Sequence, residues 1–209
     1  MNHLVLLGDS VFDNAAYVQG GAALIDQVRS ELPQGWKASL LAVDGSTCVD
    51  VSAQLQRVPV DATHLLLSAG GNDALGCLGR LELPVSSVKQ ALQVLMQIQT
   101  EFQRAYCNLL HELLAQGLPL MVCTIYDSVP GMPAPLKTAL SLFNDVIVRE
   151  ALRHQVPVLD LRHILTDAAD YSRVSPIEPS SRGGAKLATA VARRTVMLTT
   201  NSSQSGRQA

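Results

Sequence analysis

Three short motifs of small and polar residues each follow an apolar run of the sequence. They are Gly8-Asp9-Ser10, Asp44-Gly45-Ser46 and Gly70-Gly71-Asn72-Asp73. In chain order they offer a serine hydroxyl, a glycine backbone N–H and an asparagine side-chain amide. A hydroxyl nucleophile beside two hydrogen-bond donors suits attack on an acyl carbonyl, because the donors stabilise the negative charge that develops on its oxygen. Together the three motifs indicate hydrolysis of an acyl ester.

The expected roles follow from the residue types. Ser10 would be the nucleophile, exposed at a turn from strand to helix. Gly45 has no side chain to obstruct its N–H, and Asn72 would supply a donor from its amide. Each motif alone is an ordinary turn or loop, so the prediction depends on the set, in this order, at successive strand ends.

The apolar runs that precede these motifs are of strand length and alternate with helix-like segments. The expected strands are 3–7, 38–43, 64–68, 118–124 and 156–161, and the expected helices are 21–31, 48–55, 85–115, 135–154 and 182–198. Continuous apolar strands separated by amphipathic helices predict a parallel sheet covered on both faces. We therefore expect one three-layer, doubly wound α/β domain over residues 1–198, followed by a polar, disordered tail at 199–209.

A doubly wound sheet binds its ligands beyond the C-terminal ends of the strands. Ser10 follows the first expected strand, Gly45 the second and Asn72 the third, while Glu178 precedes the last helix. Residues far apart in the sequence are thus expected to meet at one edge of the sheet. Tyr126, after the fourth strand, is expected to line the same pocket, together with Asp127, Val129 and the proline-rich segment 130–135.

Composition narrows the classes of function. The chain has 209 residues, of which 47% are hydrophobic and 16% charged, with a formal net charge of −2. This is a globular composition with no basic block for nucleic acid or an anionic membrane surface. No apolar run approaches the ~20 residues of a membrane span, and no signal peptide is visible, so we expect a cytoplasmic protein. The four cysteines show no zinc-binding spacing, and we expect free thiols, no metal and no organic cofactor.

The motifs resemble the sequence blocks of the SGNH hydrolases, also called the GDSL esterase/lipase family. The matching residues are Gly8-Asp9-Ser10, Gly45, Gly71-Asn72-Asp73 and the segment from Pro179 to Gly183, and the resemblance extends from about Leu4 to Ala192. It implies a flavodoxin-like sheet of five parallel strands in the order 2-1-3-4-5. It also implies that Ser10 is the nucleophile and that the oxyanion hole uses the Ser10 and Gly45 N–H groups and the Asn72 side chain. Known activities in the family are the hydrolysis of esters, thioesters and acetylated sugars.

The fourth block departs from the family pattern. Family members usually carry Asp-x-x-His-Pro-x-x-x-Gly, whereas this chain has Ser175-Pro176-Ile177-Glu178-Pro179 and then Gly183. The flanking proline and glycine keep the register, so Ser175 stands at the Asp position and Glu178 at the His position. The stretch is similar to that of a bacterial subgroup of the family. The two changes are chemically consistent, because a carboxylate base has no tautomer for a second acid to fix.

Glu178 is therefore the expected base, although an ordinary Glu has a pKa near 4.3 and His near 6.5, a difference of roughly 3 kcal/mol in proton affinity. Burial can raise the pKa of a glutamate towards that of histidine. In a competing interpretation, Glu178 forms a structural ion pair with one of three arginines. The candidates are Arg162, Arg173 and Arg182.

A second candidate base is His163, because Asp160-Leu161-Arg162-His163 also has the Asp-x-x-His spacing. It lacks the following proline and glycine and comes early relative to the last helix. The sequence thus favours Glu178 over His163 as the base.

The preferred prediction is a serine hydrolase that cleaves a small carboxylic ester or an acylated metabolite through an acyl-Ser10 intermediate. The alternative is a catalytically impaired protein of the SGNH fold that binds an acyl or sugar ligand. A flavodoxin-like phosphate or cofactor binder is disfavoured, because the loop from Gly8 to Phe12 is short of glycines and carries an acid where an anion would sit. A small-molecule ester is the expected partner, and the sequence predicts no oligomeric state.

Overall fold

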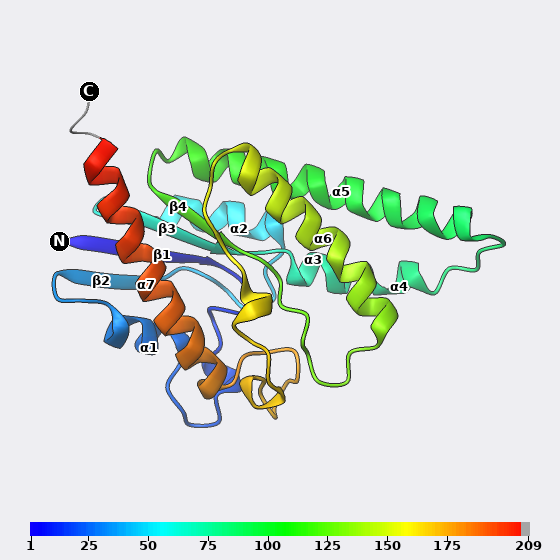
Figure 1. Cartoon of the computed structure of the whole chain (residues 1–209), viewed down its shortest axis with the longest axis horizontal. Helices are drawn as coiled ribbons and strands as arrows, with labels where there is room; N and C mark the ends of the chain where they lie inside the picture. The colour runs from blue at the N-terminus through cyan, green and yellow to red at the C-terminus, as the bar shows by residue number, and fades with distance from the viewer. Residues whose placement is uncertain (206–209) are drawn as a thin grey trace.

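Five parallel strands form one sheet in the order β2-β1-β3-β4-β5 (Figure 1), which confirms the doubly wound α/β fold expected from the sequence. The computed structural model describes the backbone of residues 1–205 and the side chains of residues 1–199. The strands are β1 (Asn2–Gly8), β2 (Trp36–Leu40), β3 (His64–Ser68), β4 (Leu120–Cys123) and β5 (Val158–Leu159).

Helices cover both faces of the sheet. Alternate side chains of β1 point to opposite faces, and each set joins a separate core. Leu4 and Leu6 pack with α1 (Leu24–Glu31) and α7 (Ser181–Ser205). Val5 and Leu7 pack on the other face with three helices. These are α2 (Cys48–Gln54), α5 (Val88–Ala115) and α6 (Ala134–Arg153).

Shorter elements complete the chain between these helices and strands. The short α-helices are α3 (Gly71–Gly76) and α4 (Leu78–Leu81), and the 3₁₀ segments are η1 (Ala15–Tyr17), η2 (Leu55–Arg57), η3 (Leu161–His163) and η4 (Ala168–Asp170). The region of α3 was not among the helices expected from the sequence. It becomes helical after Gly70, which turns the chain with φ of 115°, a backbone conformation that glycine adopts readily.

Several boundaries differ from expectation. The second strand starts and ends earlier than predicted, and the fifth has only two residues. Helix α7 continues to Ser205 instead of ending at Leu198, so the first part of the predicted tail is helical. Residues 206–209 lie outside the described part of the chain.

The C-terminal end of β1 has room only for a glycine. Gly8 pairs with Ser68, has φ of 135° and leaves no room for a side chain, because a Cβ there would lie 1.8 Å from the Ser68 carbonyl oxygen. A glycine is required at this point. It sets the position of the turn that carries Ser10.

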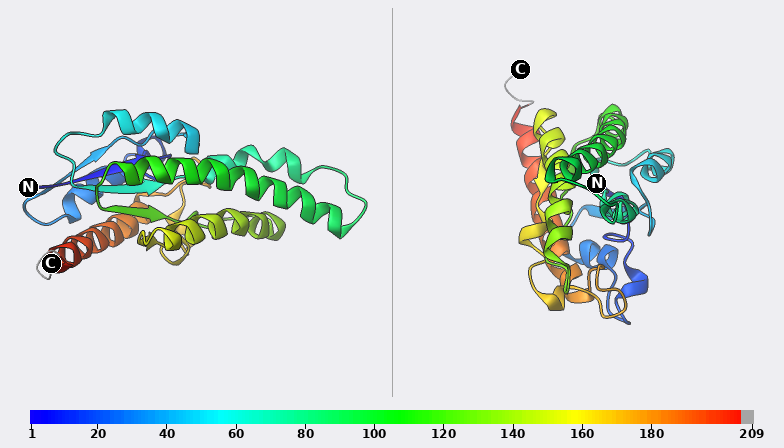
Figure 2. Two further views of the ribbon diagram at one scale, coloured as in Figure 1. Left: turned by 90° about the horizontal axis from the view of Figure 1, so that it is seen from above. Right: turned by 90° about the vertical axis from the view of Figure 1, so that its right-hand side faces the viewer.

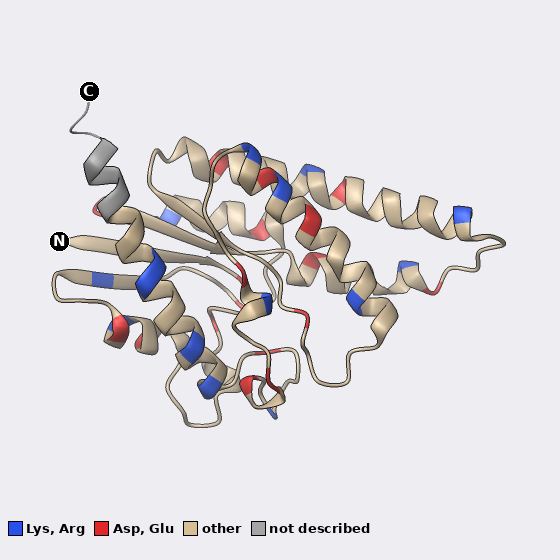
Figure 3. Cartoon of the chain, viewed as in Figure 1, with Lys and Arg blue, Asp and Glu red and all other residues tan. Residues whose placement is uncertain are grey.

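The helices α3 and α4 and the N-terminal half of α5 extend past this end of the sheet (Figures 1 and 2). Acidic residues occur in the loops at the same end, while α7 carries several Lys and Arg residues (Figure 3). None of the helices in the described residues is both long and apolar enough to cross a membrane.

Candidate active site

Ser10 and Glu178 form a direct hydrogen bond at the C-terminal end of the sheet. The Ser10 hydroxyl donates to Glu178 Oε1 at 3.0 Å, although the two residues are 168 positions apart. Ser10 is 7% exposed and Glu178 6% exposed. This is the geometry of a nucleophile hydrogen-bonded to a general base.

The backbone around Glu178 is held by four hydrogen bonds. Ser172 N–H donates to the Glu178 carbonyl at 2.7 Å, and Glu178 N–H donates to the Ser175 carbonyl at 3.0 Å. The Tyr126 hydroxyl donates to the carbonyl of Ile177. From the turn after Ser10, Asn14 Nδ2 donates to the Pro179 carbonyl at 3.4 Å. The carboxylate is therefore presented to Ser10 by an anchored loop.

None of the ion pairs among the described side chains includes Glu178, so its predicted pairing with an arginine is not found. Arg162 pairs with Asp160 at 2.5 Å, and Arg182 lies 3.4 Å from Asp167. Burial raises the pKa of Glu178, the hydrogen bond from Ser10 lowers it, and the charge of Asp44 raises it further. The net upward shift makes Glu178 a stronger proton acceptor than an ordinary glutamate.

His163 does not join Ser10. Its side chain is 84% exposed, and its Nε2 lies 3.8 Å from Asp160 Oδ2 at the surface. The carboxylate of Asp160 is already engaged by Arg162 and by the Thr124 hydroxyl at 2.9 Å. Residues 161–163 form the short helix η3 immediately after β5, so the chain turns before His163 could reach the nucleophile.

Asn72 lies with Ser10 and Glu178 on one cavity, whereas Gly45 is not among the residues that line it. Gly45 occupies an exposed turn with φ of 80°, on a separate depression outside the cavity. The two loops are nevertheless joined, because Asn72 Nδ2 donates to the Ser46 carbonyl at 3.0 Å. The structure thus brings Ser10, Asn72 and Glu178 together on one cavity. Gly45 lies outside it and directly precedes Ser46, whose carbonyl accepts the hydrogen bond from Asn72.

Gln54, a residue that sequence analysis missed, connects the first two motifs. Its Oε1 accepts the Gly8 N–H at 2.9 Å, and its Nε2 donates to the Gly8 carbonyl at 2.8 Å and to Ser46 Oγ at 3.3 Å. The residue is 2% exposed. Since Ser46 also accepts from Asn72, one hydrogen-bonded chain joins all three motifs.

Asp73 attaches the third motif to α2. Its carboxylate accepts the Cys48 N–H at 3.1 Å, at the N-terminus of that helix. Free N–H groups and the helix dipole both favour a negative charge there. The contact fixes the loop that carries Asn72 against the loop that carries Gly45.

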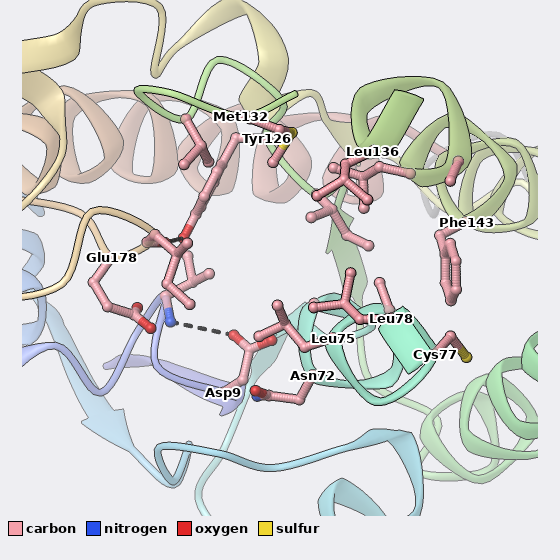
Figure 4. A pocket seen from close by; sticks show the side chains of 18 of the residues that line it. Asp9, Asn72, Leu75, Cys77, Leu78, Tyr126, Met132, Leu136, Phe143 and Glu178 are labelled. Atoms are coloured by element: carbon pink, nitrogen blue, oxygen red, sulfur yellow. Dashed lines mark hydrogen bonds between the residues drawn. The ribbon is translucent and has the colours of Figure 1, made fainter. Parts of the chain in front are cut away.

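The cavity beside Ser10 has a volume of about 390 Å³ and is mostly apolar. Its polar wall is formed by Asp9, Ser10, Ser68, Asn72 and Glu178. Away from this wall, Figure 4 shows Leu75 and Leu78 of the α3–α4 region facing Leu136 and Phe143 of α6 across the opening. Tyr126 and Val129 line it as expected, and Asp127 does not.

Asp9 is the second buried carboxyl group of the site. It is 3% exposed, and its Oδ1 accepts from the Val11 N–H and the Ser68 hydroxyl, each at 3.2 Å. Burial raises its pKa to about 7, against the lowering effect of these hydrogen bonds. Sequence analysis placed Asp9 in a motif and gave it no role.

The described residues contain no group of three or more His, Cys, Asp or Glu side chains arranged to hold a metal ion. The four cysteines are free thiols.

The chain matches one protein family in comparisons with known proteins. Residues 6–186 match the family model described as the GDSL-like Lipase/Acylhydrolase family. None of the curated proteins compared with the chain matches it.

Several solved structures share the fold at low sequence identity. A lipase from a goat rumen metagenome has a TM-score of 0.71 and 17% identity, over 91% of this chain and 96% of its own. A lipase/acylhydrolase from Enterococcus faecalis has a TM-score of 0.63 and 20% identity, over 93% of this chain and 95% of its own. An acetyl xylan esterase variant from Geobacillus stearothermophilus has a TM-score of 0.64 and 16% identity, over 92% of this chain and 93% of its own. At these identities the likeness establishes the fold.

Proposed function

Because the chain belongs to the GDSL-like lipase/acylhydrolase family, whose members are hydrolases that act on ester bonds, we propose that it cleaves a small carboxylic ester or an acylated metabolite through an acyl-Ser10 intermediate. The observation that carries the proposal is the 3.0 Å hydrogen bond from the Ser10 hydroxyl to Glu178 beside an apolar cavity. It joins a nucleophile to a proton acceptor where an acyl group can bind.

In the acylation step, Glu178 takes the hydroxyl proton as Ser10 Oγ bonds to the carbonyl carbon. The negative charge that forms on the carbonyl oxygen is stabilised by the N–H group of Ser10 and by the Asn72 amide, whereas Gly45, the other donor expected from the sequence, does not line the cavity. The carbon–oxygen bond to the alcohol then breaks, and Glu178 returns the proton to the departing alkoxide. Water attacks the acyl-enzyme with Glu178 again as base, which releases the acid and restores Ser10.

A glutamate base suits this site for a physical reason. In a Ser-His-Asp triad the acid holds the histidine in the correct tautomer and stabilises its imidazolium. Glu178 has no tautomers, and the position that would carry the acid is the neutral Ser175. The raised pKa of Glu178, caused first by burial, recovers part of the proton affinity that an ordinary carboxylate lacks.

The shape of the cavity favours an acyl group larger than acetyl. Leu75, Leu78, Leu136 and Phe143 offer no polar partner to a short, hydrated group, and burying apolar surface contributes about 25 cal/mol per Å². Lipases and acetyl xylan esterases both occur among the similar structures. The apolar wall here favours the longer acyl chains.

The proposal is tested with p-nitrophenyl esters of increasing chain length and a fluorophosphonate probe. We expect labelling of Ser10 and turnover, both reduced at least about 10³-fold in Ser10→Ala. Glu178→Ala and Glu178→Gln should lose most of the turnover, while Glu112→Gln, on the exposed side of α5, is the matched control. Unchanged turnover in Glu178→Ala would remove Glu178 from the mechanism. Ligand binding without labelling or turnover would favour the impaired, ligand-binding alternative.

A further inference from the structure

Asp9 and Glu178 are two carboxyl groups on one cavity (Figure 4). The hydrogen bonds of Asp9 are one-sided: Oδ1 accepts both the Val11 N–H and the Ser68 hydroxyl. Oδ2 has no hydrogen-bond partner among the described residues and lies on the side of Gly71, 3.7 Å from where a Cβ of that glycine would be. One oxygen is thus an acceptor, and the other is free to carry a proton.

Among the described side chains, no cation pairs with this carboxyl group. The titratable groups that interact with it electrostatically are Glu178, Cys48 of α2, Cys123 of β4 and Tyr126 of the following loop. Burial raises the pKa of both thiols and of the phenol, so these three are neutral and only Glu178 carries charge. A buried carboxyl group without a cation, beside another carboxylate, favours its neutral form.

We propose that Asp9 keeps a proton on Oδ2 while Glu178 is ionised, and that this O–H donates a hydrogen bond to the carbonyl oxygen of the ester bound against Ser10. The inference rests on the proposed function and adds a catalytic residue to it. The pKa of Asp9, raised to about 7 by burial, agrees with this assignment. Asp9 donates the hydrogen bond and keeps its proton throughout the reaction.

A neutral Asp9 beside an ionised Glu178 suits ester hydrolysis. An ionised Asp9 would place a second negative charge beside the carbonyl oxygen, where negative charge develops, and would oppose the reaction. A neutral acid contributes a donor instead, and one such donor typically contributes about 10²–10³ in rate. One carboxyl group of a site can thus act as the base while a neutral neighbour acts as a hydrogen-bond donor.

The first test compares Asp9→Asn with Asp9→Ala in ester hydrolysis over a range of pH. Asparagine keeps an acceptor for Val11 and Ser68 and an N–H donor towards the cavity. We expect Asp9→Asn to keep most of the kcat, and Asp9→Ala to lose about 10²-fold. In the wild type, kcat should fall above about pH 7 as Asp9 ionises, and Asp9→Asn should lack this fall. A fall that persists in Asp9→Asn, or equal losses in both variants, would overturn the proposal.

The second test does not depend on activity. Aspartate labelled with ¹³C at the carboxyl group is titrated by NMR in the wild-type protein, and the Asp9 resonance is assigned by its absence in Asp9→Asn. We expect one aspartate with a midpoint near pH 7. If every aspartate titrates below about pH 5, the proposal is wrong. If the midpoint lies near pH 7 but the protein hydrolyses no ester, the protonation of Asp9 is supported and the proposed function is wrong.

Discussion

At the scale of single residues, the base that we propose is a buried carboxylate. Glu178 is hydrogen-bonded to Ser10, lacks an ion pair among the described residues, and is 6% exposed. A carboxylate in water would be a weak base for a serine hydroxyl. The surroundings of Glu178 therefore determine how much activity the site can have.

The pH dependence of catalysis should report the ionisation of Glu178. Only the ionised carboxylate can accept the Ser10 proton, so kcat/KM should fall as the pH drops through the pKa of Glu178 in the free enzyme. Because burial raises that pKa, the fall should occur at a higher pH than the ordinary glutamate value of about 4.3. Initial rates in buffers of constant ionic strength measure it. A half-point at or below that ordinary value would contradict the raised pKa.

Asp9 should make stability depend on pH. Its pKa is 3.8 in an ordinary environment and about 7 in the folded protein, so the folded state holds the proton more tightly than the unfolded chain does. The stabilisation is complete below about pH 4 and lost as the pH rises to about 7, at about 1.4 kcal/mol per pH unit. Asp9→Asn lacks this loss, so its stability relative to the wild type should increase over that range and then level off.

Urea unfolding of both proteins at a series of pH values measures this difference. Asp26→Asn, an exposed position on α1, controls for the removal of one acidic side chain. If the difference between Asp9→Asn and the wild type stayed constant between about pH 5 and about pH 7, Asp9 would have an ordinary pKa in the folded state.

At the scale of the elements, the site depends on a side chain at the end of α2. Gln54 binds both backbone groups of Gly8 and the hydroxyl of Ser46. It therefore holds the end of β1, which leads to Ser10, against the loop whose carbonyl holds Asn72. Gln54 is not among the cavity-lining residues, so its contribution to catalysis would be positional.

Gln54→Leu should lower both stability and turnover. It removes three hydrogen bonds and leaves the N–H of Gly8 buried without this partner, at a cost of about 2–4 kcal/mol. We expect kcat to fall about ten-fold or more with little change in KM. Gln103→Leu, which removes a 2.9 Å bond to Glu150 on α6, is the control and should leave kcat unchanged. A loss of stability in Gln54→Leu without a loss of kcat would make Gln54 purely structural.

Much of this arrangement could be predicted from the sequence, and the reasons are physical. Apolar runs set the five strands, and parallel strands must bring Ser10, Asn72 and Glu178 to one edge. Gln54 was missed because a glutamine in a seven-residue helix shows no periodic signal, and its hydrogen bonds are all to distant residues. His163 had the right spacing, but only the turn after β5 shows that its side chain faces solvent.

At the scale of the whole molecule, the cavity is built from layers that are far apart in the sequence. One wall is the α3–α4 region and another is α6, which packs against the long helix α5. Both walls extend past the sheet (Figure 1). In the proposed function, the size of the acyl group would therefore be set by helices outside the sheet.

Filling this cavity should shift the preferred acyl chain towards shorter ones. Ala139 of α6 lines the cavity, and Ala139→Phe would place a ring in the space for the chain. We expect kcat/KM for an octanoate ester to fall about ten-fold or more relative to a butyrate ester. Ala115→Phe, at the exposed C-terminal end of α5, is the control. An unchanged ratio in Ala139→Phe would place the acyl group elsewhere.

The bond between Ser10 and Glu178 spans 168 positions, which has a consequence for biosynthesis. A chain still emerging from the ribosome has made Ser10 early, yet it lacks the proposed base, Glu178, until all five strands have been translated. Unfinished chains would carry an ordinary serine alcohol. Reactivity would then arise only on the nearly completed product, and a nascent polypeptide could not consume ester ahead of time.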